Sequence, residues 1–195
     1  MITAVGHENL PPDTLALVER ELRVRVERYA GPAPGLVRAG AGLPAAFGRA
    51  VRASGRRLVV VLPACGLVPA AVPPGRPDPL REVTELADEV RPLAYDPADR
   101  DARVRADETL VAHSERLLAV WDGSPTDGRD ATAHLVAYAR AHGVRVEVVW
   151  PVGAVRGTPG PATPRPARPD APRPAAPRSA SSRPARPAAP TEGTR

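Results

Sequence analysis

The amino-acid sequence predicts an α/β fold in which helices cover both faces of an open, doubly wound, mostly parallel sheet of six strands. Two observations carry this prediction. Along residues 1–156, short apolar runs alternate with stretches whose apolar residues recur every three or four positions. The run Leu58–Leu62 consists of five consecutive large aliphatic residues, which is typical of a parallel strand that is covered on both faces.

The first two elements show the alternation clearly. The apolar run Ile2–Gly6 ends in glycine and predicts a buried strand. After the helix-start signal Pro11–Thr14, apolar residues recur at spacings of three and four as far as Tyr29, which predicts a helix with one buried face. The further expected strands are residues 36–40, 58–62, 90–95, 117–121 and 144–150, and the further expected helices are residues 45–51, 78–89, 97–114 and 131–142.

The last 39 residues, 157–195, differ in composition from the rest of the chain. They hold seven arginines, Asp170 and Glu192, which accounts for the whole formal charge of +5, and 11 of the 26 prolines. They contain no Val, Leu, Ile or aromatic residue, so they cannot bury enough apolar surface to offset chain entropy. We expect a neutral Rossmann-like domain over residues 1–156 and a disordered Pro/Ala/Arg-rich tail over residues 157–195.

Several classes of protein are excluded by composition. Cys65 is the single cysteine, so a disulfide framework or a cysteine-based zinc site within the chain is excluded. The most apolar stretch, 58–74, is broken by prolines, and the N-terminus has no leader-like pattern, so we expect a cytoplasmic protein without membrane contact. The chain has no lysine for a P-loop, and Ala45 stands where a GxGxxG motif starting at Gly40 needs its third glycine. No metal or conventional dinucleotide motif is present, and the cofactor stays unknown.

Candidate site residues follow from the fold class, because open parallel sheets bind ligands beyond the C-terminal ends of their strands. Glycine at a strand end allows close approach of a ligand or serves as a turn residue. Asp122 is suited to ribose hydroxyls or to a turn, and Thr132 to a phosphate or to capping a helix. Asp127 and Asp130 flank Arg129 and are expected in a solvated charged loop. The candidate ligand-binding residues are Gly6, His7, Gly40, Gly42, Asp122, Gly123, Gly128 and Thr132.

Three stretches of the chain resemble a known superfamily. They are residues 4–7, which end in a Gly-His turn, residues 117–123, and residues 128–150. They are similar to the Rossmann-like SLOG superfamily, which joins the lonely-guy phosphoribohydrolases with the nucleotide-fold domains of DNA-processing protein A. The resemblance covers about residues 2–152 and implies a pocket for a nucleotide or a nucleotide-derived molecule, with residues 128–132 facing its phosphate.

The chain departs from the patterns of the superfamily and of its phosphoribohydrolases at three places. Leu135 stands where the family's motif has its catalytic glutamate, and Arg105 lacks the lysine partner of the family's Arg-Lys pair. The family's second-strand motif usually continues as an acidic Gly-Ala-Asp type sequence, whereas the segment 42–45 of this chain has no carboxylate. We therefore assign no catalytic residue from the resemblance.

Three functions remain open at this point. The first is a binding module for a nucleotide or nucleotide-derived molecule, acting as a sensor or regulatory domain. The second is a nucleotide hydrolase with a divergent site, in which Asp122 or His7 is the acid or base. The third is a DNA-associated module that contacts nucleic acid through the basic tail. A homodimer is a further expectation, based only on the size of the domain.

Overall fold

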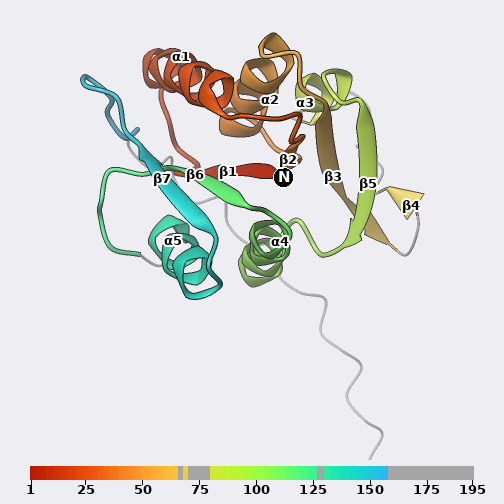
Figure 1. Ribbon diagram of the computed structural model, residues 1–195. Coiled ribbons are helices and arrows are strands. Elements are labelled where there is room, and N and C mark those ends of the chain that lie inside the picture. Colours follow the sequence, from red (N-terminus) through yellow and green to blue (C-terminus); the bar gives the residue numbers. More distant parts are fainter. Residues whose placement is uncertain (66–67, 70–79, 127–129, 158–195) are drawn as a thin grey trace, which may run out of the picture. The chain divides into compact units, whose positions relative to one another are not determined.

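The chain forms one mixed sheet flanked by helices in a computed structural model that describes residues 1–65, 68–69, 80–126 and 130–157. These residues belong to a single unit, Met1–Gly160. Six strands are mutually parallel in the order β5-β3-β2-β1-β6-β7, and β4 pairs antiparallel with the end of β3 (Figure 1). The strands are β1 (Ile2–Gly6), β2 (Gly35–Arg38), β3 (Leu58–Cys65), β4 (Val68–Pro69), β5 (Glu89–Ala94), β6 (Arg116–Val120) and β7 (Arg145–Val149).

Helices cover both faces of this sheet, which confirms the predicted α/β doubly wound fold. In Figure 1, α1 (Pro12–Arg28), α2 (Leu43–Ala53) and α3 (Arg81–Glu85) lie on one face. The helices α4 (Arg100–Ala112) and α5 (Thr132–Ala141) lie on the opposite face. Within the described residues, no helix combines the length and the apolar character needed to cross a lipid bilayer.

Each face of the sheet carries its own apolar core. Along β6, Leu118 and Val120 join the core beneath α1 and α2, whereas Leu117 and Ala119 join the core beneath α5. All four side chains are fully buried. Because successive side chains point to opposite faces of a strand, a strand covered on both sides needs apolar residues at every position. This is the physical reason why the central strands can be found from the sequence.

Most elements begin or end one to three residues from the expected positions, and two regions differ further in their structure. Strand β3 continues past Leu62 to Cys65, where β4 pairs with it, and a two-residue strand such as β4 leaves no periodic signal. The helix expected at 78–89 is shorter, because α3 ends at Glu85. Beyond it, Oδ2 of Asp88 accepts a hydrogen bond from the backbone N–H of Leu58 at 2.8 Å. This bond links the residue before β5 to the start of β3.

The connection order reverses between the neighbouring strands β1 and β6. From β1 the chain continues to β2 on one side, and it returns much later to β6 on the other side. The two strands approach closely at Gly6, where an added Cβ would lie 2.6 Å from both Cβ and the carbonyl oxygen of Val120. Such a reversal leaves a crevice beyond the C-terminal strand ends, which is the usual place of a ligand site in doubly wound sheets.

Candidate functional site

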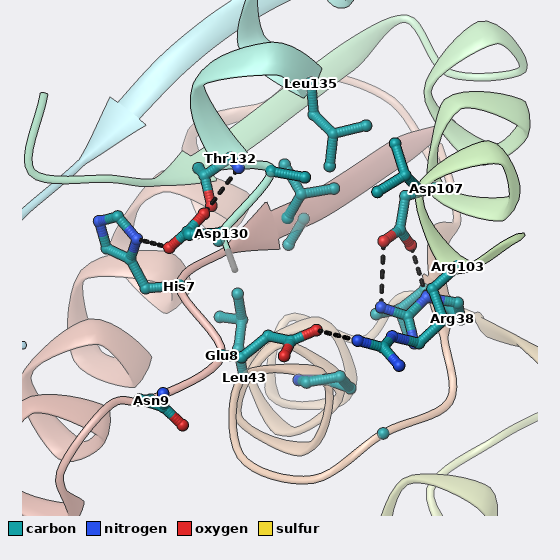
Figure 2. A pocket seen from close by; sticks show the side chains of 18 of the residues that line it. His7, Glu8, Asn9, Arg38, Leu43, Arg103, Asp107, Asp130, Thr132 and Leu135 are labelled. Atoms are coloured by element: carbon teal, nitrogen blue, oxygen red, sulfur yellow. Dashed lines mark hydrogen bonds and ion pairs between the residues drawn. The ribbon is translucent and has the colours of Figure 1, made fainter. Parts of the chain in front are cut away.

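A cavity of about 330 Å³ lies beyond the C-terminal ends of β1 and β2. Its walls come from the loop after β1, the segment between β2 and α2, one side of α4 and the start of α5 (Figure 2). The main polar residues of these walls are His7, Glu8, Asn9, Arg38, Arg100, Arg103, Asp107, Asp130 and Thr132.

The structure brings four of the eight expected site residues to the cavity. Gly6, His7, Gly40 and Thr132 line it. Asp122 stands outside the lining and contacts His7 instead. Gly42, which starts α2 with a positive φ of 71°, and Gly123, with a φ of 88°, lie outside the lining as well. Gly128 lies outside the described residues.

His7 is buried between two carboxylates, with 2% of its surface exposed. Its Nδ1 contacts Oδ2 of Asp130, and its Nε2 lies 3.0 Å from Oδ1 of Asp122. The ring also meets Trp150 edge-on, with 5.5 Å between the ring centroids. His7 therefore connects the end of β1 to the loop after β6 and to the start of α5.

Both aspartates that flank His7 are held in the ionised form. Burial opposes ionisation of Asp130, but hydrogen bonds from His7 and Thr132 outweigh it and keep the pKa of this carboxyl well below its usual value. For Asp122, burial is likewise outweighed by hydrogen bonds from Ser124 and by His7, so its pKa is also lowered. The Asp130 side chain is only 12% exposed. The expectation of a solvated loop therefore fails at this residue.

The C-terminal strap, residues 151–157, supplies a cation to the same cluster. Arg156 places one guanidinium nitrogen 3.4 Å from Oδ2 of Asp130 and the other 3.9 Å from Oδ2 of Asp122. The strap is fastened to the domain by two hydrogen bonds between Thr14 Oγ1 and the backbone of Val155. The two carboxylates thus have a cationic neighbour from a segment at the end of the described chain.

The opposite wall of the cavity is one side of α4. Residues 100, 103, 104 and 107 line it, a spacing that places them on one helical face. At the back of this wall, Arg38 from β2 donates to both oxygens of Asp107, at 2.7 and 3.0 Å. Burial disfavours the charge of Arg38, but Asp107 and Tyr95 outweigh it and raise the pKa of the guanidinium.

Several site residues were not found from the sequence. They include Arg100, Arg103 and Asp107 of α4. Their spacing in the sequence is that of one helical face, but it identifies a site only when the side of α4 that faces the sheet is known. Arg105, which the resemblance singled out, is exposed and does not line the cavity. The described residues hold no group of three or more His, Cys, Asp or Glu side chains suited to a metal ion.

Comparison with known proteins identifies no family. No protein-family model and no curated protein sequence matches the chain. One solved structure similar to it is that of the molybdenum cofactor carrier protein from Chlamydomonas reinhardtii, at 18% identity and a TM-score of 0.47, covering 75% of this chain and 74% of that chain. A second structure of the Moco carrier protein from the same organism has 15% identity and a TM-score of 0.44, covering 76% and 74%. Similarity at this level assigns neither a family nor a ligand.

Proposed function

We propose that this chain is a binding module for a nucleotide or nucleotide-derived small molecule, of the sensor or regulatory kind. The observation that carries the proposal is the cavity of about 330 Å³ at the C-terminal ends of β1 and β2, beside the reversal of strand order. Ligands of doubly wound sheets bind at this place. The volume lies at the small end of the roughly 300–1,000 Å³ that small-molecule pockets span, which favours one mononucleotide-sized ligand.

The lining is charged and suits a polar ligand, since arginines stand in it beside the carboxylates of Glu8, Asp107 and Asp130. Three arginines from two elements contribute to it, Arg38 from β2 and Arg100 and Arg103 from α4. Gly40 offers backbone without a side chain, and Leu135 and Val104 supply apolar wall. This combination of apolar surface with a few convergent charged groups is typical of a specific small-molecule site.

The arrangement of His7 and Leu135 favours binding over hydrolysis. Each ring nitrogen of His7 faces a carboxylate oxygen, so neither is directed at a ligand as an acid or base. Leu135, which stands at the position that the resemblance gives to a catalytic glutamate, is buried in the cavity wall and has no proton to exchange. We therefore place the hydrolase second.

Thermal unfolding of the full chain with a panel of nucleoside monophosphates, NAD and ADP-ribose derivatives tests the proposal. A ligand at about 100 times its dissociation constant stabilises a protein by roughly 2.7 kcal/mol, which raises the unfolding temperature by roughly 5–11 °C at this chain length. Ala41→Trp, at an exposed residue of the cavity lining, should abolish the rise. The matched control Ala30→Trp, at an exposed residue away from the cavity, should preserve it.

Two results would decide against the proposal. A panel without any stabilising compound removes the nucleotide assignment, and an equal rise in the Ala41→Trp and Ala30→Trp variants places binding outside this cavity. Release of base or phosphate from the stabilising compound, followed over time, would favour the hydrolase.

A further inference from the structure

We propose that the anionic group of the bound molecule docks on the cavity side of α4, at Arg100 and Arg103, and that the N-terminal end of α5 does not receive it. The inference rests on the proposed function and deepens it, because it says which wall of the cavity binds the anionic group of the ligand. The ligand class that it selects is a small molecule with one terminal anionic group, such as a phosphate monoester.

The start of α5 is already occupied by side chains of the protein itself. The backbone N–H of Thr132 donates to Oδ1 of Asp130 at 2.7 Å, and the backbone N–H of His134 donates to Oγ1 of Thr126 at 3.1 Å. Free N–H groups and the helix dipole are what attract an anion to a helix start. Here an ionised carboxylate satisfies one of these groups and adds a negative charge that repels a phosphate.

Asp130 is held firmly in this position. Its other oxygen, Oδ2, contacts Nδ1 of the buried His7 and lies 3.4 Å from Arg156. A ligand that displaced the carboxylate would have to break these contacts and leave His7 without one of its two partners, at a considerable energetic cost. Asp130 therefore excludes a phosphate from the start of α5 in the folded protein.

The arginines of the α4 wall differ in how firmly they are paired. Arg38 is committed to both oxygens of Asp107. Arg103 donates from Nη1 to the carbonyl oxygen of Pro97 at 3.1 Å, whereas its Nη2 atom lies 3.6 Å from Oε1 of Glu8, which is longer than a hydrogen bond. Arg100 pairs at 3.3 Å with its exposed chain neighbour Asp101, and its buried Nε has no hydrogen-bond partner among the described residues. Arg100 and Arg103 are thus the cationic groups best able to accept a new anion.

Glu8 occupies the position from which a ligand anion would reach Arg103. Figure 2 shows its side chain extending from the loop after β1 toward the guanidinium of Arg103 on α4. The Glu8 side chain is 59% exposed, so moving it into solvent costs little. An entering anion would replace Glu8 at Arg103, whereas it could not replace Asp130 at Thr132.

The test is a titration of the full isotope-labelled chain with inorganic phosphate, followed by NMR. We expect the side-chain Nε–H signals of Arg100 and Arg103 to shift, and the backbone amide signal of Thr132 to stay in place. Arg103→Gln should weaken phosphate binding about tenfold, as expected for the loss of one charge-assisted hydrogen bond. Glu8→Gln should tighten binding, because it removes the competing carboxylate.

The matched control is Arg105→Gln, which removes the same charge from the same helix at an exposed residue outside the cavity lining. It should leave the dissociation constant within about twofold, since exposed charges at a distance are screened by salt. Equal weakening by Arg103→Gln and Arg105→Gln would overturn the inference, as would a phosphate-dependent shift centred on Thr132 or the absence of any phosphate-dependent shift. If nucleoside monophosphates still stabilise the chain in such a case, this inference alone fails. If they do not, the proposed function fails with it.

Discussion

Arg38 and Asp107 form a two-pronged ion pair between the end of β2 and the middle of α4, with Nε to Oδ1 at 2.7 Å and Nη2 to Oδ2 at 3.0 Å. The exposed fractions of the two side chains are 20% and 15%. The pair fixes the distance between the sheet and α4 beside the cavity. The geometry of the α4 wall therefore depends on it.

Asp107→Asn should destabilise the protein, because it leaves the guanidinium of Arg38 largely buried without its negative partner. Breaking a fully buried pair costs roughly 3–5 kcal/mol, and for this partly exposed pair we expect about 2–3 kcal/mol. Urea unfolding followed by circular dichroism measures the loss. Glu27→Gln, which breaks the exposed pair between Glu27 and Arg23, should change stability little.

A double variant distinguishes the stabilisation that the Arg38–Asp107 pair contributes from the cost of leaving one buried charge without its partner. Arg38→Met combined with Asp107→Leu should recover much of the stability that Asp107→Asn loses, because no charge then remains buried. A double variant less stable than the single one would contradict this account.

Acid should destabilise the protein through Asp122 and Asp130, whose pKa values are lowered in the folded state. An unfolded aspartate titrates at about pH 3.9. As the pH falls through that range, the unfolded chain takes up protons that the folded chain does not, so the free energy of unfolding decreases. The stabilisation by these carboxylates is complete above about pH 5 and is lost progressively below it.

Asp130→Asn should reduce this pH dependence. The measurement is the free energy of unfolding in urea between about pH 6 and about pH 3, where the variant should give a shallower slope than the unmodified chain. Asp13→Asn, at an exposed residue of α1, should keep the original slope. An unchanged slope in Asp130→Asn would show that this carboxylate is not the source.

Gly6→Ala should separate β1 from β6. The added Cβ would meet the carbonyl oxygen and Cβ of Val120 at 2.6 Å and a Leu43 methyl at 2.8 Å, and the backbone oxygen cannot move aside. Overpacking of this kind costs about 1–3 kcal/mol. The matched control is Gly40→Ala, whose Cβ would meet only Pro44 Cγ, at 3.3 Å. Thermal unfolding should show a clear loss of stability for the first variant and a small change for the second.

The sequence predicted the central strands well because of the way the sheet is buried. Strand β1 has the expected bounds Ile2–Gly6, and the aliphatic run 58–62 lies within β3. Helices cover both faces of these strands, so the run 58–62 is apolar throughout, and the single polar residue of β1, Thr3, is buried with its hydroxyl donating to the carbonyl oxygen of Leu36 at 2.7 Å. The helix expected at 78–89 is present as the shorter α3, whereas the two-residue β4 is too short for a period to be visible in the sequence.

The site was predictable only in part, because half of it depends on contacts between distant segments. Strand ends are local features, so His7 and Gly40 could be found from the sequence. Asp130 stands in a charged sequence that looks solvated, but in the fold its side chain contacts His7, which lies 123 positions away, and Arg156. Arg103 was not found from the sequence, because its place in the cavity wall depends on the rotation of α4 about its axis, which packing against the sheet determines.

His7 and the two aspartates that contact it are far apart in the sequence, and this separation determines when the cavity can form. Asp122 and Asp130 are made 115 and 123 positions after His7 during translation. Strand β1 must wait equally long for β6, its neighbour in the sheet. Pairings this distant in sequence slow folding, because the entropy of closing the long loop is lost before the contacts stabilise the chain. A nascent or truncated chain that stops before β6 therefore lacks the wall of the cavity that Asp130, Thr132 and Leu135 supply.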